Sequence, residues 1–223
     1  MNFRHEWKHE ITAYDRYMLR LRLGAVCRPD AHAKDGKYTI RSLYFDDASD
    51  TALREKLDGV SVREKFRLRC YNGDTSLIHL EKKSKFSALG TKSTAAVTRE
   101  EVSALLNGDM TWMMDAERPL VCELYTKMVT QGLRPKTIVD YTREPFIYDP
   151  GNVRVTMDYN IRTGLGGTDF LSMDCITVPV PDDPIILEVK WDGFLPGIIR
   201  DAVQLTGRHT GAYSKYAACR AYD

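Results

Sequence analysis

The chain has 223 residues, of which 43% are hydrophobic and 28% are charged, and its formal net charge is +1. This composition is typical of a folded globular protein and argues against long disordered regions and a diffusely basic nucleic-acid-binding surface. We expect one domain over residues 1–223. The five cysteines are an odd number without a CxxC pair, so we expect no disulfide framework and no zinc site.

The cysteine pattern fits a reducing cytoplasm. The N-terminal segment lacks the apolar core of a signal peptide, and no stretch approaches the ~20 apolar residues that a transmembrane helix needs. We therefore expect a cytoplasmic protein without direct membrane insertion, whose membrane or surface-protein partner, if it has one, is encoded separately.

A strand and a helix are predicted at the start of the chain. Residues 4–11 alternate as in a strand. Thr12 and Asp15 have the spacing of a capping box, so a helix is expected to follow and to end near Gly24. One face of this helix carries Tyr14, Met18 and Leu21.

Strands dominate the region that follows. Residues 39–46, 61–71 and 77–83 have the two-residue alternation of strands, and Asn72-Gly73 marks the turn between the last two. Further along, Thr98 begins a second capping box for a short helix to about Leu106.

The second half of the chain returns to strands after one more helix. The remaining predicted elements are a helix over 119–131, strands over 137–149, 153–161 and 184–191, and two helices between 197 and 221, the second capped by Ser214. The glycines of 164–167 lack the strand–helix context of a dinucleotide-binding motif, so we predict a flexible turn there.

Charged residues recur at every second position in several of these strands. Arg63, Lys65, Arg67 and Arg69 share one face of a strand because residues two apart point the same way. The same pattern occurs at Arg4, Glu6 and Lys8; at His79, Glu81, Lys83 and Lys85; at Arg154, Thr156 and Asp158; and at Glu188 and Lys190. For any single strand, an ordinary solvated face explains this pattern.

Five strands with such faces favour a second explanation. Neighbouring cations on a sheet repel one another, so a cluster of about ten cations in a concave site requires an anion to fill it. The expected ligand is a dense polyanion. Carboxylates on the same faces suit a hard divalent cation that also binds phosphate oxygens, and these are Glu6, Glu81, Asp158 and Glu188.

A sheet with polar faces turned inward and helices outside can hold such a ligand. We therefore predict an α+β fold, an antiparallel eight-stranded tunnel-type β-barrel with flanking helices.

A series of short motifs in this order resembles a known family. The motifs are R-x-E-x-K (4–8), S-L-Y-F-D (42–46), K-x-R-x-R-x-Y (65–71), L-E-K-K-S-K (80–85), Y-x-R (141–143), R-V-T-M-D (154–158), L-E-V-K (187–190) and S-K-Y (214–216). Together they resemble the VTC domain, which is the polyphosphate polymerase catalytic domain of the triphosphate tunnel metalloenzyme, or CYTH-like, superfamily.

The resemblance implies a metal-dependent phosphotransferase. It would transfer the γ-phosphate of ATP to a polyphosphate chain inside a basic tunnel, with Mn²⁺ or Mg²⁺. The implied catalytic residues are Arg67, Arg69, Lys83, Arg143, Arg154 and Glu188, and Glu188 would also hold the metal. The phosphate-binding residues would be Arg4, Lys8, Lys65, Arg67, Arg69, Lys83, Lys85, Lys92, Tyr141, Arg143, Arg154, Lys190 and Lys215.

Three alternatives remain open from the sequence. A tripolyphosphatase or polyphosphate hydrolase would use the same lumen with water as acceptor, but Arg4 stands where the hydrolytic branch has the first glutamate of E-x-E-x-K. A non-catalytic polyphosphate-binding module is the second alternative. Nucleic-acid binding is the third, and the absence of an RNP-type motif argues against it.

Overall fold

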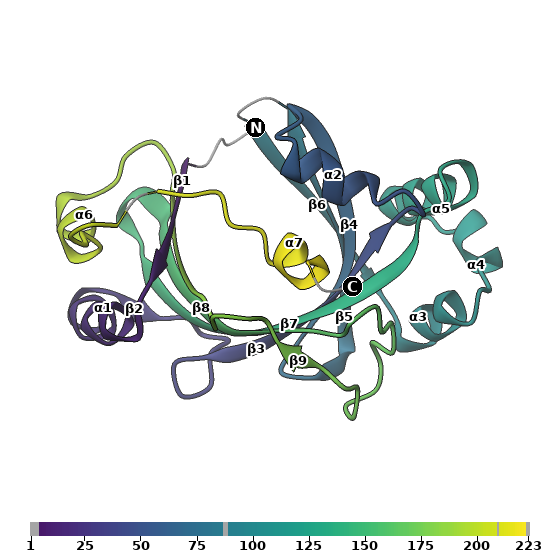
Figure 1. The fold of residues 1–223 in the computed structure, drawn as a ribbon. Helices are drawn as coiled ribbons and strands as arrows, with labels where there is room; N and C mark the ends of the chain where they lie inside the picture. Colours follow the sequence, from purple (N-terminus) through teal and green to yellow (C-terminus); the bar gives the residue numbers. More distant parts are fainter. Residues whose placement is uncertain (1–4, 87–88, 209, 222–223) are drawn as a thin grey trace. The chain divides into compact units, whose positions relative to one another are not determined.

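The computed structural model describes residues 5–86, 89–208 and 210–221, and its strands belong to an antiparallel sheet (Figure 1). The described chain forms two compact units, each assembled from three separate segments. The first unit consists of Met1–Thr39, Tyr141–Ile161 and Pro179–Ser214, and the second of Ile40–Asp140, Arg162–Val178 and Lys215–Asp223. The expectation of a single domain stays a prediction.

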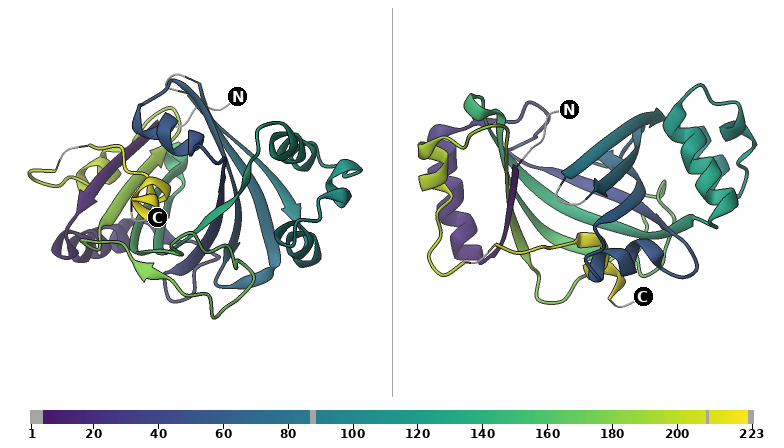
Figure 2. Two further views of the ribbon diagram at one scale, coloured as in Figure 1. Left: turned by 45° about the vertical axis from the view of Figure 1, so that its right-hand side comes forward. Right: turned by 90° about the horizontal axis from the view of Figure 1, so that it is seen from above.

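In the first unit, the strand order is β1-β10-β8-β7. These strands are β1 (His5–Ile11), β10 (Ile185–Trp191), β8 (Val153–Thr163) and β7 (Arg134–Tyr148), while the short strands β2 (Arg28–Pro29) and β9 (Val178–Pro179) pair with β7 and β8. A single turn of 3₁₀ helix, η1 (Pro150–Asn152), connects β7 to β8. Residues of β8 and β10 such as Val155 and Leu187 form an apolar core with α1 (Ala13–Val26) and α6 (Gly197–Ala202), which lie next to each other (Figure 2).

The helix α1 begins as predicted but buries a different face. The Thr12 hydroxyl accepts from the Asp15 backbone N–H, and the Asp15 carboxylate accepts from the Thr12 backbone N–H, so the capping box is confirmed. The buried residues are Leu19 and Leu23, whereas Tyr14 is 71% exposed. The packing of α1 against the sheet selects the buried face, and this packing involves residues far away in the sequence.

In the second unit, the strand order is β7-β3-β4-β5-β6. Besides β7, the strands are β3 (Tyr38–Asp46), β4 (Val62–Tyr71), β5 (Asp74–Phe86) and β6 (Leu89–Val97). The helices α3 (Arg99–Leu106), α4 (Thr111–Met114) and α5 (Pro119–Thr130) pack on the apolar face of these strands, around Phe66, Leu68 and Ile78 (Figure 1). The remaining helices are α2 (Thr51–Leu57) and α7 (Lys215–Arg220).

Most predicted strands and helices are found close to their expected positions, and β6 and α2 are the longest of the elements that were not predicted. The residues of β6 include Gly90 and small polar side chains, so they lack the alternation typical of a strand, but all of Leu89–Val97 pairs with β5. The helix α2 depends on Asp46, whose carboxylate accepts from the backbone N–H groups of Ala52 and Leu53. Both elements are therefore specified by partners outside their own sequence.

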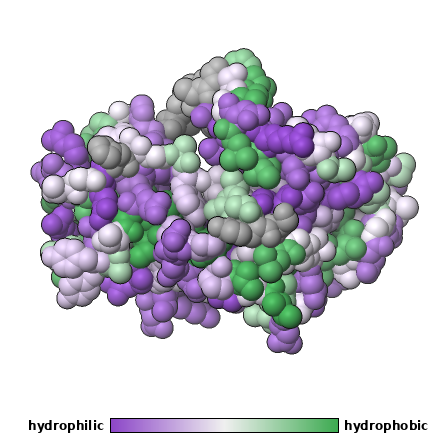
Figure 3. Space-filling view, in the orientation of Figure 1, coloured by the Kyte–Doolittle hydropathy of each residue, from purple (hydrophilic) through white to green (hydrophobic). Residues whose placement is uncertain are grey.

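One face of the molecule is mainly polar (Figure 3). Hydrophilic residues cover most of the face seen in Figure 3, and hydrophobic residues occur there in smaller groups. None of the helices in the described part of the chain combines the length and hydrophobicity that a membrane-spanning helix needs.

Candidate functional site

A row of three lysines crosses the second unit on the face opposite the apolar core. Antiparallel pairing places Lys65 of β4 opposite Lys83 of β5, and Lys83 opposite Lys92 of β6. Side chains directly opposite each other have Cβ atoms about 4.5–5.5 Å apart, and like charges at this distance destabilise a sheet. Because a bound anion would remove this repulsion, the row is suited to binding a chain of phosphates.

Arg67 and Arg69 lie on the same face of β4, and each is only 5% exposed. Such burial is incompatible with a fully solvated outer face at these two positions. Arg67 donates from Nε and Nη2 to the Glu81 carboxylate at 2.7 and 2.6 Å and from Nη1 to the Tyr44 hydroxyl at 2.8 Å. Arg69 donates from Nε to the Ser42 hydroxyl at 3.1 Å. Partners on β3 and β5 therefore fix the orientation of both guanidinium groups.

Glu81 provides the negative charge on this face. The residue is 1% exposed, and its carboxylate lies 3.7 Å from Nη1 of Arg69 and 2.5 Å from Nζ of Lys92. Burial by itself raises the pKa of the Glu81 carboxyl, but the charges of Arg67 and Arg69 outweigh burial and lower the pKa well below its usual range. One carboxylate does not neutralise two arginines and three lysines, so this face keeps a net positive charge.

Tyr44 of β3 lies opposite Arg67 in the strand register and was not among the predicted site residues. Burial by itself raises the pKa of the Tyr44 phenol, but nearby positive charges, first that of Arg67 and then that of Lys65, lower the pKa to about 8. The ring stacks on Tyr216 of α7 with centroids 4.8 Å apart. The alternation of Ser42 and Tyr44 with the apolar residues of β3 was the available signal, because it places both on the charged face.

Two of the motifs that carry the family resemblance, S-L-Y-F-D (42–46) and S-K-Y (214–216), have a structural role in the second unit. Tyr216 donates its hydroxyl proton to the buried Asp46 at 2.6 Å, so Asp46 links α2 to α7. Asp50 likewise accepts from Arg220, and this hydrogen bond lowers the pKa of Asp50 to about 2. These contacts position α7, whose first residue is Lys215.

In the first unit, two lysines and two carboxylates of β1 and β10 form one group. Strand pairing places Lys8 opposite Glu188 and Glu6 opposite Lys190. The Lys8 amine contacts Glu6 and lies 3.8 Å from Glu188, and the Lys190 amine contacts Glu188 and lies 3.7 Å from Glu6. Although burial by itself lowers the pKa of Lys8, the two carboxylates, first Glu188, raise the pKa above its ordinary value.

Arg143 of β7 and Asp158 of β8 form a buried ion pair in the first unit. Arg143 donates from Nε and Nη2 to the two carboxylate oxygens of Asp158 at 2.6 and 2.7 Å. Burial by itself lowers the pKa of Arg143, but the Asp158 charge outweighs burial and raises the pKa well above its ordinary value. The guanidinium also lies 5.5 Å from the ring centroid of Tyr141, so this arginine is permanently charged and held in place.

Two polar atoms of β8 are buried without a hydrogen-bond partner among the described residues. They are Nε of Arg154 and the hydroxyl of Thr156, and both lie on the face that carries Asp158. Nη2 of Arg154 donates to Asp30 at 2.8 Å and to the Tyr38 hydroxyl at 2.7 Å, which holds the side chain. A buried polar group without a partner costs about 1–3 kcal/mol, so both atoms are suited to contact a ligand.

The carboxylates differ in how well they suit a divalent cation. Both oxygens of Asp158 accept from Arg143, and Glu81 contacts three cations. Glu6 and Glu188 each lie close to both lysines of this group, and Glu188 lies opposite Thr156 in the strand register. Two carboxylates and a hydroxyl form an all-oxygen donor set of the type that Mg²⁺ and Mn²⁺ prefer. Within the described ranges, no three His, Cys, Asp or Glu side chains come together as a ready ligand group.

The predicted site residues thus fall into two groups, one in each unit. Arg4 lies outside the described residues, and Lys85 lies opposite Arg63 towards the end of β5. The first group contains Glu6, Lys8, Tyr141, Arg143, Arg154, Asp158, Glu188 and Lys190. The second contains Lys65, Arg67, Arg69, Glu81, Lys83, Lys85 and Lys92, with Lys215 on α7. The role of each residue stays a prediction.

The antiparallel sheet with its flanking helices is the arrangement of a tunnel-type α+β fold. The sequence profile of the VTC domain matches residues 3–222, and the chain belongs to this family. Family membership and fold indicate that this protein binds triphosphate or polyphosphate and has the fold of a phosphoryl-transfer enzyme.

Solved structures with a similar fold share little sequence identity with this chain. A Bacillus halodurans protein provisionally assigned as an adenylate cyclase is 12% identical, with a TM-score of 0.51 and coverage of 87% of this chain and 82% of its own. A Vibrio parahaemolyticus protein with the same provisional assignment is 10% identical, with a TM-score of 0.46 and coverage of 85% and 76%. At 12% identity, the likeness to the Bacillus halodurans structure shows the fold alone. A search of curated proteins found no match.

Proposed function

We propose that this protein is a polyphosphate polymerase that transfers the γ-phosphate of ATP to the end of a polyphosphate chain. The observation that carries the proposal is the row of Lys65, Lys83 and Lys92 beside the buried Arg67 and Arg69. These residues present regularly spaced positive charge, and a linear phosphate polymer presents regularly spaced negative charge.

The side chains would act by positioning phosphates and stabilising charge. Phosphoryl transfer needs no protein nucleophile, because an oxygen of the terminal phosphate of the acceptor chain attacks the γ-phosphorus directly, the bond to the bridging oxygen breaks and ADP leaves. Arg67 and Arg143 have their guanidinium groups fixed by Glu81 and Asp158, so they can bind phosphate oxygens without reorganising. In the first unit, Nε of Arg154 and the Thr156 hydroxyl would contact further phosphate oxygens.

A divalent cation fits the oxygen donors of the first unit. Glu6 and Glu188 would hold it, with the Thr156 hydroxyl close to the site. When bound, Mn²⁺ or Mg²⁺ would supply positive charge to phosphate oxygens that the arginines do not reach. Lys8 and Lys190, which contact both carboxylates, would then turn to phosphate groups of the substrate.

To test this function, the purified protein is incubated with ATP and Mn²⁺, and the products are resolved by chain length on a gel. We expect a ladder of long chains, and we expect Arg67→Ala to abolish it. Lys127→Ala is the matched control, because Lys127 of α5 pairs with Glu64, which alternates with Lys65 and lies on the other face of β4. Orthophosphate as the product would support a hydrolase instead.

A binding-only module is the second candidate. The observation in its favour is that Glu6, Glu81, Asp158 and Glu188 all contact cations in this structure. Such a module would be stabilised by polyphosphate, by about 2.7 kcal/mol at one hundred times the dissociation constant, without consuming ATP.

A further inference from the structure

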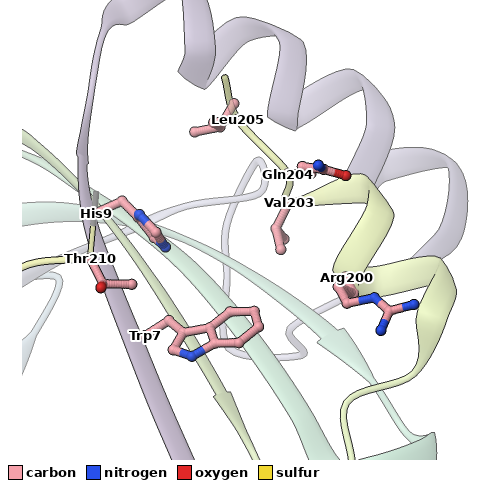
Figure 4. Close-up of a pocket in the computed structure, with 7 residues that line it drawn as sticks. All are labelled: Trp7, His9, Arg200, Val203, Gln204, Leu205 and Thr210. Carbon is pink, nitrogen blue, oxygen red and sulfur yellow. The ribbon is translucent and has the colours of Figure 1, made fainter. Parts of the chain in front are cut away.

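A pocket lies in the first unit on the side of β1 that faces away from Lys8. It has a volume of about 390 Å³ and is lined by Trp7, His9, Arg200, Val203, Gln204, Leu205 and Thr210. Figure 4 shows the rings of Trp7 and His9 projecting from β1 toward Val203. The volume is within the lower range of small-molecule sites.

Neighbouring contacts fix the walls of this pocket. Trp7 packs against Trp191 in a T-shaped arrangement with ring centroids 4.7 Å apart, and Val203 is 7% exposed in the same core. On the other side, the backbone N–H of Gly211, next to Thr210, donates to the Lys8 carbonyl at 2.9 Å. The pocket is therefore held between β1, the residues that follow α6, and residues 210–211, which contact β1.

The lining combines apolar side chains with polar ones. Nδ1 of His9 is buried and has no hydrogen-bond partner among the described residues. An unmet hydrogen bond at a buried nitrogen is unfavourable, so the pocket is better suited to a ligand with a hydrogen-bonding edge than to a hydrocarbon. The indole, the imidazole and the two aliphatic side chains suit a planar ring.

The cationic group of the lining is largely exposed to solvent and is therefore a weak binding group for an anion. The guanidinium in the pocket wall belongs to Arg200, whose side chain is 66% exposed and lies 3.8 Å from the Asp201 carboxylate on the same helix. The polar side chains of Gln204 and Thr210 are neutral. We propose that this pocket binds a neutral, planar heteroaromatic compound such as a nucleoside, with His9 contacting an edge of the ring.

The proposal is tested by calorimetric titration of the full chain with adenosine, guanosine, cytidine and uridine. We expect at least one of them to bind with a dissociation constant below about 1 mM, and ribose not to bind. Without a phosphate group, these probes are poor ligands for the charged face. His9→Phe keeps the ring but removes Nδ1, and we expect it to weaken binding at least tenfold.

Two further variants complete the test. Gln204 is exposed, so Gln204→Ala is expected to leave the fold intact and to weaken nucleoside binding several-fold. Lys83→Ala, on the charged face, is expected to weaken polyphosphate binding and to leave nucleoside binding unchanged. The proposal is wrong if none of the four nucleosides binds, or if Lys83→Ala abolishes nucleoside binding while His9→Phe and Gln204→Ala do not affect it.

Discussion

Replacement of Glu81 by glutamine tests whether the charged face of the second unit is built for an anion. Glu81 is 1% exposed and contacts Arg67 at 2.6 Å and Lys92 at 2.5 Å. Breaking a buried ion pair costs about 3–5 kcal/mol, and glutamine still accepts hydrogen bonds, so we expect Glu81→Gln to cost about 3 kcal/mol. For a chain of this length, this corresponds to a fall in melting temperature of about 6–12 °C.

The assay is thermal unfolding with and without polyphosphate. A polyphosphate chain would supply the negative charge that the variant has lost, so we expect it to raise the melting temperature of Glu81→Gln more than that of the wild type. Glu123→Gln is the control, because Glu123 of α5 pairs with Lys82, which alternates with Glu81 and lies on the other face of β5. The cost of this partly exposed pair is expected to be below about 1 kcal/mol.

The difference in the free energy of unfolding between the wild type and Glu81→Gln should also depend on pH. The pKa of Glu81 is lower in the folded protein than in the unfolded chain, so its ionised form stabilises the fold above the unfolded pKa of about 4.3. This contribution is lost as the pH falls below that value towards the folded pKa. The difference between the wild type and Glu81→Gln should therefore be complete at pH 7 and shrink below about pH 4. An unchanged melting temperature at pH 7, or equal stabilisation of both proteins by polyphosphate, would contradict the reasoning.

Three further predictions concern the groups that would contact substrate or metal. Thr156→Val removes a buried hydroxyl without changing the shape of the side chain. We expect this variant to lose polyphosphate synthesis at least tenfold, with an unchanged or raised melting temperature. Thr142→Val is the control and is expected to keep activity, because Thr142 lies on the other face of the sheet. Polyphosphate affinity of the wild type should fall above about pH 8 as Tyr44 becomes negatively charged beside Arg67, and Tyr44→Phe should show no such fall in binding titrations from pH 7 to 9. Glu188→Gln should raise the Mn²⁺ concentration needed for half-maximal synthesis by more than tenfold; an unchanged requirement would remove Glu188 from the metal site.

The sequence by itself determined the local features of this protein. The strand alternation was visible in residues 61–71, because side chains two apart on a strand share a face whatever the strand pairs with. The capping boxes at Thr12 and Thr98 were predictable because both partners lie within one turn. The order of the motifs was sufficient to indicate the family, and the family profile confirmed it.

The tertiary structure decided which residues share a group and which of them are buried. Pairing of β4, β5 and β6 aligned the three lysines and placed Glu81 against Arg67, although β6 itself lacks a clear strand pattern. The positions of Tyr44, Thr156 and the pocket at His9 likewise depend on long-range packing. Alternation along one strand fixes the face of a residue, but the residue opposite it depends on strand register, which the packing of the whole sheet determines.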